Sequence, residues 1–320
     1  MFVSLVTGAI PLAAVFLFGC VGEIIMEKSG HLNLGIPGIM CAGTAGGCLG
    51  AYLYMSAFRS NPSWLLLVLF SVFLAFLFAA VVGGIYGFLT VSLRCNQNIT
   101  GLALTTFGVG FTQFFIDNFI DRNYLYSASR IINKSLSFSK DLGWFGEIFL
   151  SYGILVYIAV AVAVVASVFL KKTKVGLRLR SIGENPATAD AAGINVTAFK
   201  YSAIFIGSGI AGLGGFYYIM GYLGGSWENA STIEALGWLS IALVIFTLWR
   251  PNLSILGSFI FAVLYILAFK ITGISFSQMS LLKLLPYVVT IIVLIFTSIF
   301  GSKNVQPPAA LGLNYFREDR

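Results

Sequence analysis

Few side chains in this chain of 320 residues are able to do chemistry. Glu23 and Glu27 stand one helical turn apart at the end of an apolar run, and Lys28 follows them directly. The single histidine, His31, lies three residues further on in a polar connection. We interpret the carboxylate pair as a solvated helix end at a membrane surface, with a role at a pore mouth or in partner contact as the alternative.

The four cysteines have neither a CxxC spacing nor a histidine nearby, so they indicate no metal site and no redox site. We expect all of them to be small, buried hydrophobic side chains. They are Cys20, Cys41, Cys48 and Cys95. The HExxH, GxSxG and P-loop motifs are also missing from the sequence. The sequence therefore predicts no catalytic residues, no cofactor and no ATP site on this chain, which is not expected to be an enzyme.

The composition indicates the environment in which the chain folds. Hydrophobic residues make up 58% of it and charged residues only 10%, whereas about 25% of an ordinary soluble domain is charged. Such a chain cannot cover a water-facing surface, which excludes a soluble enzyme, a disulfide-rich secreted domain and a disordered tail. Nine stretches lack any Asp, Glu, Lys, Arg or His, and most approach the roughly 20 residues that span a membrane. We predict an all-α polytopic integral membrane protein with about eight to ten transmembrane helices.

Three features of the apolar segments go beyond a simple count. The run 60–93 would form a helix about 51 Å long, and Gly83, Gly84 and Gly87 offer places where it could bend or break. The segment 271–282 is too short to span and is expected to be re-entrant or interfacial. Glycines are dense between residues 30 and 50, which favours close helix packing, with a broken helix beside a cavity as the alternative.

The basic residues predict the topology. Between residues 171 and 200, six Lys and Arg residues stand against Glu184 and Asp190, and short basic loops stay on the cytoplasmic side of a membrane. This loop is therefore expected to face the cytoplasm, which places residues 94–99 inside and residues 121–147 outside. The first apolar run has no basic residue before Lys28, so we expect it to be a retained span rather than a cleaved signal peptide.

Within the basic loop, residues 183–193 (GENPATADAAG) predict a short helix. Asn185 is a good N-cap, Pro186 suits the first helical position, and the alanines favour helix. Gly193 can end the helix in a left-handed cap. Because a helix of about two turns is marginal alone in water, we expect it to be held against its own bundle or against a separate cytoplasmic subunit. A surface turn between two spans is the alternative.

The same loop resembles that of a known family. Residues 174–214 (KVGLRLRSIGENPATADAAGINVTAFKYSAIFIGSGIAGLG) resemble the cytoplasmic coupling loop of ATP-binding-cassette importer permeases of the branched-chain amino acid, ribose and nucleoside superfamily. Residues 22–40 (GEIIMEKSGHLNLGIPGIM) are similar to the signature of the nucleoside and simple-sugar branch. Residues 237–242 (GWLSIA), followed by WRP at 249–251, resemble another stretch of that branch, and residues 96–104 resemble the segment that opens a pore-lining span.

The resemblance implies an architecture and a set of partners. It implies a single transmembrane permease domain, residues 1–320, with a cytoplasmic coupling loop at 171–200 and a short C-terminal tail at 303–320. Expected partners are a cytoplasmic ABC ATPase subunit, a second permease subunit, homologous or identical, an extracytoplasmic substrate-binding protein and membrane lipid, but no nucleic acid. The location is the cytoplasmic (inner) membrane of a bacterium. The residues expected to couple to the ATPase are Gly183, Glu184, Asn185, Pro186, Ala187, Asp190, Ala191 and Gly193.

A series of polar but uncharged side chains suggests where solute passes. Such groups are costly inside apolar runs unless they find partners or water, and they suit a neutral small-molecule solute with many hydroxyl groups. Hydrogen bonding between helices, with no solute involved, is the alternative. The residues expected along the substrate pathway are Asn33, Asn96, Asn98, Thr100, Thr105 and Gln113.

We predict from these observations the transmembrane subunit of an ATP-driven importer of nucleosides, with simple sugars such as ribose or galactose as the alternative. The chain departs from the nucleoside branch at Pro37, where an acidic residue is usual, and at Thr247, where glycine is common. A gradient-driven secondary transporter is disfavoured because the charge-free runs carry no Asp, Glu, His or Lys that could change charge inside the membrane. A membrane scaffold without transport activity is a further alternative.

Overall fold

The computed structural model describes residues 2–59, 61–135, 143–271, 275–300 and 306–316. Within these ranges the chain is helical and contains no strand, so the predicted all-α class is confirmed. The expected tail 303–320 is described for residues 306–316 only, and its remaining residues lie outside the described ranges.

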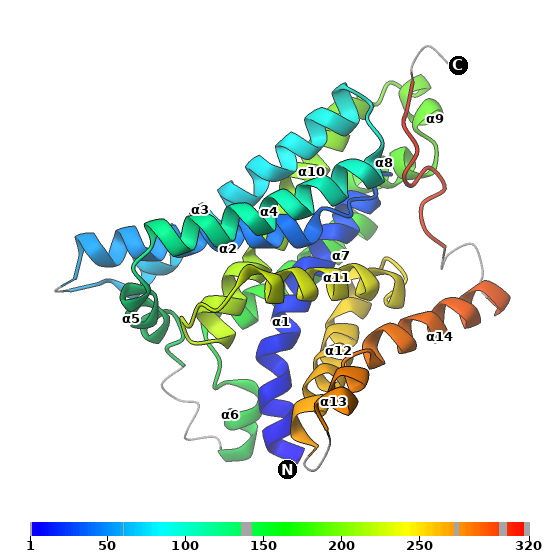
Figure 1. Cartoon of the computed structure of the whole chain (residues 1–320). Helices are drawn as coiled ribbons and strands as arrows, with labels where there is room; N and C mark the ends of the chain where they lie inside the picture. Colours follow the sequence, from blue (N-terminus) through cyan, green and yellow to red (C-terminus); the bar gives the residue numbers. More distant parts are fainter. Residues whose placement is uncertain (1, 60, 136–142, 272–274, 301–305, 317–320) are drawn as a thin grey trace.

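Long helices build the body of the molecule (Figure 1). They are α1 (Phe2–Glu27), α2 (Ile36–Ala57), α3 (Trp64–Gly87), α4 (Gln97–Phe119), α7 (Ile154–Lys172), α10 (Val196–Tyr217), α11 (Ala230–Phe246), α12 (Pro251–Lys270) and α14 (Leu285–Phe300). The connections contain shorter helices, which are α5 (Arg122–Ile132), α6 (Gly143–Phe149), α8 (Lys174–Glu184), α9 (Pro186–Ala191) and α13 (Phe276–Leu282). Helices α3 and α10 each continue into a π-helical turn, Phe88–Ser92 and Tyr218–Tyr222.

In the described part of the chain, 8 helices are long and apolar enough to cross a membrane. The shorter α11, of 17 residues, also reaches from one end of the bundle to the other. At its start the Ala230 amide donates to Gln113 near the end of α4, and just after it the Trp249 indole donates to Glu27 at the end of α1. Counting α11 gives nine crossings, within the predicted range, and places the N-terminus on the side opposite α8 and α9.

Helices α1, α2 and α10 are the most buried of the spans, and glycine lets them touch. A Cβ added at Gly22 of α1 would collide with the backbone of Gly207 in α10. Between α2 and α10, a Cβ on Gly43 would collide with the backbone of Gly212. The dense glycines therefore serve close helix packing, as expected, because only the absence of a side chain permits backbones to approach this closely.

The run 60–93 is interrupted at only one of the three glycines that could bend it. Helix α3 continues through Gly83 and Gly84, which receive side chains of α10, and it ends at Gly87, where a π-helical turn begins. A Cβ on Gly83 would meet the Ser208 side chain, and one on Gly84 would meet the Phe205 ring at 2.8 Å. Glycine therefore occurs both where a neighbouring helix packs closely and where a helix breaks, and the sequence alone does not distinguish the two.

The short apolar segment 271–282 does not span alone. Helix α13 has only 7 residues and leads into α14. Taken together, Ser277–Phe296 is long and apolar enough for a crossing. Residues 272–274 of the segment lie outside the described ranges.

The prediction that all four cysteines are buried is correct for Cys20, Cys41 and Cys48 and wrong for Cys95. Cys95 lies in the connection between the end of α3 and the start of α4, where the chain leaves the bundle. The residue before it, Arg94, has a positive φ of 57°, which turns the backbone outward. The apolar run in the sequence therefore extends beyond the packed interior.

Candidate functional site

The coupling loop and the end of the chain occupy one end of the molecule. Figure 1 shows α8, α9 and the C-terminal segment together at this end, and α5, α6 and the N-terminus at the other. The basic charge of the loop predicts that the end that carries α8 and α9 faces the cytoplasm, and we call it the cytoplasmic end on that ground. The connection 94–97 lies at this end because Asn314 of the C-terminal segment donates to the Arg94 carbonyl at 2.7 Å.

Helix α9 forms where the sequence predicts a short helix. The Asn185 side chain accepts from the Thr188 amide at 2.9 Å, and Pro186 is the first helical residue. The helix ends at Ala191. Gly193, two residues later, has a φ of +79°, and the Ile194 amide donates back to the Ala189 carbonyl at 3.1 Å. An N-cap and a left-handed C-terminal glycine together satisfy backbone groups that so short a helix cannot satisfy itself.

Its own chain holds α9 in place. Ala189 is buried against Ile182 of α8 and Val196 of α10, and these three form a small apolar cluster separate from the main core. The ring of Tyr315, from the C-terminal segment, packs against the same cluster. The alternative in which α9 is a plain surface turn is therefore wrong.

The predicted coupling residues divide into an outer and an inner group. Glu184, Asn185, Ala191 and Gly193 are exposed, and Pro186, Ala187 and Asp190 are partly exposed. Gly183 is buried instead, and a Cβ there would meet the Lys28 carbonyl at 2.5 Å. Gly183 thus allows α8 to pack closely against Lys28, the residue that follows α1. The other seven residues form a surface that a partner could contact.

Residues 28–35, which we name the 28–35 turn, connect α1 to α2 and tie several helices together. The Leu32 amide donates to the Gln97 side chain at 2.9 Å, and the Leu32 carbonyl accepts from the Tyr86 hydroxyl at 2.7 Å. The Leu34 carbonyl accepts from the Thr105 hydroxyl at 2.9 Å. The turn is therefore fixed to α3 and to α4 at the cytoplasmic end.

The interpretation of Glu23 and Glu27 as a solvated helix end is wrong. Both side chains are buried, at 0% and 3% relative exposure. Glu23 accepts from the Asn33 amide at 3.1 Å, and Glu27 accepts from the Trp249 indole. The pair thus joins α1 to the 28–35 turn and to the corner between α11 and α12.

Two basic groups of the 28–35 turn are also withdrawn from water. Burial lowers the pKa of Lys28, and the negative charges of nearby Glu184 and Glu27 partly offset this lowering. Burial and the positive charge of Lys200 hold the pKa of His31 well below its ordinary value. His31 is therefore a neutral ring near pH 7, and it packs edge-on against Tyr86.

The predicted pathway residues do not form one continuous surface. Asn33, Thr100 and Thr105 are buried, and each is hydrogen-bonded within the protein. Asn96 caps α4 by accepting from the Ile99 amide at 3.1 Å. Of these bonds, only that of Thr105 to the Leu34 carbonyl joins α4 to another element. Those of Asn96 and Thr100 lie within α4 and its cap, and the Asn33 side chain accepts from the Gly35 amide within the 28–35 turn. Their place along a solute pathway stays a prediction.

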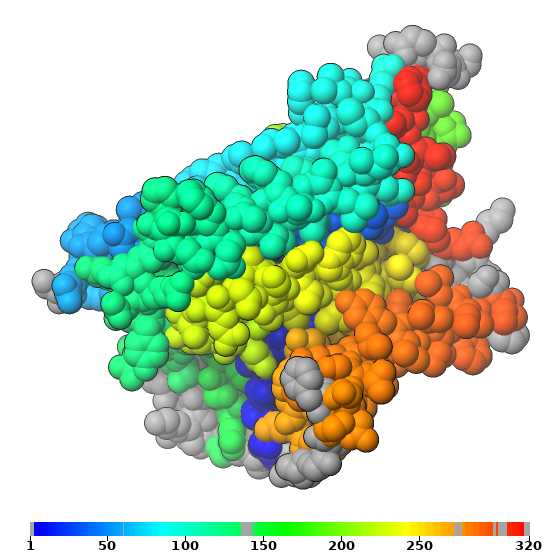
Figure 2. Space-filling model, in the orientation of Figure 1, coloured from blue at the N-terminus to red at the C-terminus, as the bar shows by residue number. Residues whose placement is uncertain are grey.

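Three other polar residues of α4 lie on its uncovered side. Asn98 and Thr106 are exposed and Gln113 is partly exposed, and their spacing of seven or eight residues places them along one face of the helix. Figure 2 shows α4 along the surface of the molecule beside α11. We name Asn98, Thr106 and Gln113 the α4 polar face.

At the outer end of α4, Asp117 collects several donors. The Trp227 indole donates to it at 2.9 Å, Arg122 forms an ion pair with it at 2.7 Å, and the Gln113 amide also donates to it. Gln113 in turn accepts from the Ala230 amide. This cluster fixes the start of α11 to α4. Its only indication in the sequence was the position of Asp117 at the edge of a charge-free run.

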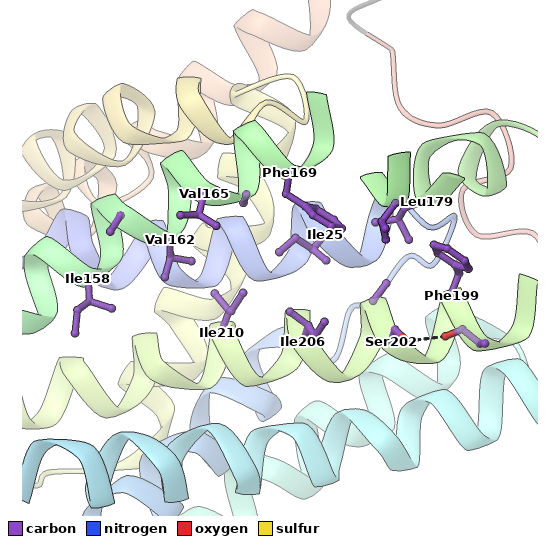
Figure 3. A pocket seen from close by; sticks show the side chains of 15 residues that line it. Ile25, Ile158, Val162, Val165, Phe169, Leu179, Phe199, Ser202, Ile206 and Ile210 are labelled. Carbon is purple, nitrogen blue, oxygen red and sulfur yellow. Dashed lines mark hydrogen bonds between the residues drawn. The ribbon is translucent and has the colours of Figure 1, made fainter. Parts of the chain in front are cut away.

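An apolar cavity of about 630 Å³ between α7 and α10 is unsuited to a polar solute. Figure 3 shows Ile158, Val162 and Val165 of α7 facing Ile206 and Ile210 of α10 across it. The hydroxyl of Ser202, at the edge, is already bonded to the Ala198 carbonyl of its own helix at 2.8 Å. A sugar or nucleoside here would leave its hydroxyl groups without partners.

The sequence reasoning missed the role of the C-terminal segment and of Trp249. The sequence indicated the role of the C-terminal segment through the apolar and aromatic residues of 311–316 (LGLNYF), because such residues are unfavourable in a tail that is exposed to water. The signal for Trp249 was its place directly before Arg250-Pro251, at the start of α12.

Comparisons with known proteins agree with this architecture. A nucleoside ABC transporter permease protein of Lactococcus lactis subsp. cremoris, NupC, is 31% identical over 94% of this chain and 93% of its own length. The guanosine ABC transporter permease protein NupQ of Bacillus subtilis is 27% identical over 99% and 97%. A protein of Haloferax volcanii assigned as a glucose ABC transporter permease, TsgC13, is 29% identical over 98% of both chains.

A solved structure shares the fold. It is an inward-facing conformation of a transporter described as of the metal-chelate ABC type, with a TM-score of 0.50 and 14% identity over 91% of this chain and 84% of that chain. The family model for the branched-chain amino acid transport system permease component matches residues 5–296. Proteins of this kind are multi-pass permeases of the cytoplasmic membrane and are not themselves enzymes. The chain belongs to the family of branched-chain amino acid transport system permease components.

Proposed function

We propose that this chain is the membrane subunit of an ATP-driven importer of nucleosides, with all of residues 1–320 serving as one permease domain. The observation that carries the proposal is α9, a capped helix braced on its own chain with an exposed outer surface at the cytoplasmic end. Membership of the family implies an ATPase and a substrate-binding protein as partners. The names of two relatives, NupC and NupQ, support nucleosides as the solute, and the name of TsgC13 supports sugars as the alternative.

The ATPase would contact the outer residues of α9. Glu184, Asn185 and Ala191 are exposed there, while Ala189 on the opposite side anchors the helix to α8 and α10. A push on the outer surface therefore reaches the bundle through a packed contact rather than through a free loop. In this way ATP-driven movement of a separate subunit would alter the access of the pathway.

The α4 polar face would line the pathway together with a second permease subunit. Asn98, Thr106 and Gln113 are uncovered in the single chain, and polar groups facing lipid would carry a desolvation cost. A second subunit, identical or homologous, would cover this face and leave a polar channel between the two chains. Neutral amides and hydroxyls in such a channel suit the hydroxyl groups of a nucleoside or a sugar.

The first experiment tests the contact with the ATPase. The chain is co-expressed with an ABC ATPase subunit from the same organism, purified in mild detergent and assayed for bound ATPase and ATP hydrolysis. Glu184→Arg should abolish co-purification because it reverses a charge on the proposed surface. Glu147→Arg makes the same change on an exposed residue at the opposite end and should leave the complex intact. Failure of the wild-type chain to retain any ATPase would reject the proposal.

The second experiment tests solute and pathway. Uptake of labelled guanosine and uridine is measured in cells, with unlabelled ribose and glucose as competitors. Asn98→Leu and Gln113→Leu should lower uptake while ATPase binding persists, and Ile99→Leu, beside Asn98 on the exposed side of α4, should not. No uptake of either labelled nucleoside, together with uptake of labelled ribose or glucose, would establish the alternative solute class.

A further inference from the structure

Residues 306–316 form a segment that crosses the cytoplasmic end of the molecule, and we name it the C-terminal strap. Figure 1 shows it in red, running beside α8 and α9. Although it has no regular secondary structure along most of its length, Pro308 and Ala310 are buried. Because a tail without contacts would be exposed to water, the burial of these two residues shows that the segment packs against other parts of the chain.

One side of the strap binds the coupling helices. The Ala310 amide donates to the Gly183 carbonyl at 2.9 Å. The Tyr315 hydroxyl donates to the carboxylate of Asp190, on α9, at 2.7 Å. The Tyr315 ring also packs against the small cluster that anchors α9. The strap therefore holds both α8 and α9.

The other side of the strap binds the 28–35 turn and the start of α4. The Gly312 amide donates to the Gly30 carbonyl at 3.1 Å. The Gln97 side chain donates to the Leu313 carbonyl at 3.4 Å, while it also accepts from the 28–35 turn. The Asn314 side chain donates to the Arg94 carbonyl at 2.7 Å.

These bonds make the strap a bridge between two groups of elements. On one side stands α9, which carries the proposed ATPase surface, and on the other stand the 28–35 turn and α4, which carries the α4 polar face. Among element pairs with several close contacts, α9 meets α8 and α10, and α4 is not a neighbour of α9. The strap supplies the hydrogen-bonded connection between them, from Asp190 through Tyr315 and Asn314 to Gln97.

We propose that the C-terminal strap is a positioning element that transmits movement of α9 to the 28–35 turn and the first turn of α4. Tyr315 holds the α9 end of the strap, and Asn314 holds the α4 end. The inference rests on the proposed function, because it assigns a purpose only if α9 receives movement from an ATPase. It goes beyond that function by placing part of the coupling machinery in the tail rather than in the coupling loop.

The test measures coupling in the reconstituted complex of permease, ATPase and binding protein in liposomes. The readout is the amount of labelled guanosine transported per ATP hydrolysed, with labelled glucose as the probe if competition has selected a sugar. Tyr315→Phe removes only the hydroxyl that binds Asp190. The loss of one hydrogen bond of about 1 kcal/mol corresponds to roughly a fivefold change in an equilibrium, so we expect the transport ratio to fall about fivefold while ATP hydrolysis continues.

A control variant separates coupling from the general effect of losing a tyrosine hydroxyl. Tyr201→Phe removes a tyrosine hydroxyl that bonds Ser92 at 2.6 Å and so joins α10 to the π-helical turn after α3 rather than to the strap, and it should leave the ratio unchanged.

The outcomes also distinguish this inference from the proposed function. If the ATPase binds the wild-type chain and Tyr315→Phe transports with the wild-type ratio, the strap inference is overturned and the proposed function stands. A chain that ends at residue 305 should give a still lower ratio. If that shortened chain inserts, binds the ATPase and couples normally, the inference is likewise overturned.

Discussion

Trp249 is the side chain that makes a buried acid tolerable in this bundle. Its indole donates to Glu27, which is only 3% exposed. To reach that position the chain places both Leu248 and Trp249 at positive φ, 54° and 55°. Left-handed backbone costs about 1–2 kcal/mol for each residue with a side chain, so the surrounding contacts must hold the corner in this form.

Removing the indole donor should therefore destabilise the protein. We expect Trp249→Phe to lower the free energy of unfolding by about 1–3 kcal/mol, because a buried acceptor loses its partner. Trp238→Phe, at a half-buried position of α11, is the matched control. Thermal unfolding in detergent, followed with a thiol-reactive dye that reports exposure of the buried cysteines, measures both. Equal loss of stability in the two variants would contradict the assigned role of Trp249.

His31 should make stability depend on pH. Its folded pKa lies well below the unfolded value of about 6.5 because burial and the charge of Lys200 oppose protonation. Between these two pKa values the unfolded chain binds more protons than the folded chain. The contribution of neutral His31 to the free energy of unfolding is therefore fully present above about pH 6.5 and decreases as the pH falls below that value. We expect the wild type to lose more thermal stability than His31→Phe between about pH 8 and about pH 5.5. Parallel losses in both proteins would show that His31 makes no contribution.

Residues that act locally are the ones that the sequence could predict. Asn185, Pro186 and Gly193 cap α9 through bonds to near neighbours, so their types and spacing are sufficient. The burial of Glu27 depends on Trp249, 222 residues away in sequence, and no local pattern contains that information. The same holds for Tyr315 and Asp190, which the fold brings together across 125 residues.

At the scale of elements, glycine decides how closely the central helices approach. Gly43 of α2 faces Gly212 of α10, where an added Cβ would collide with backbone that cannot move independently of its helix. Gly110 of α4 has no neighbouring heavy atom within 4 Å of such a Cβ. The two positions look alike in sequence and differ only in what packs against them.

A pair of identical substitutions should separate these two cases. Gly43→Ala should cost about 1–3 kcal/mol of stability, because an inserted methyl group forces packed helices apart. Gly110→Ala should be neutral or stabilise by up to about 1 kcal/mol, because alanine is the better helix former. Unfolding of both variants in the same detergent measures the difference. A loss at Gly110 as large as that at Gly43 would mean that α4 has a close neighbour in the purified protein.

The element scale also shows why Gly83 and Gly84 do not interrupt α3. Gly83 and Gly84 are located where Ser208 and Phe205 of α10 approach, so the helix keeps its course while the neighbour fills the space. From one chain the sequence predicted that side chains would be small there, but not whether a cavity, a bend or another helix would use the space. For the same reason the polar residues of α4 could be found but not divided into buried and exposed sets.

At the scale of the whole molecule, the nine crossings, once oriented by the basic loop, place Cys95 on the cytoplasmic side. Cys95 is exposed beside the first turn of α4, whereas Cys20, Cys41 and Cys48 are buried. One native thiol can therefore report the orientation without any engineered residue. Only exposed thiols react readily with a bulky reagent.

A maleimide that does not cross membranes should label the wild-type chain in inside-out vesicles and leave it unlabelled in right-side-out vesicles. Cys95→Ser should abolish the labelling because the other three thiols are packed inside the bundle. After denaturation, all four thiols of the wild type and three of the variant should react, which confirms that burial protected them. Labelling from the outer side would reverse the topology and place α9 where no cytoplasmic ATPase could reach it. Orientation, ATPase contact and coupling through the strap therefore depend on the same end of the molecule.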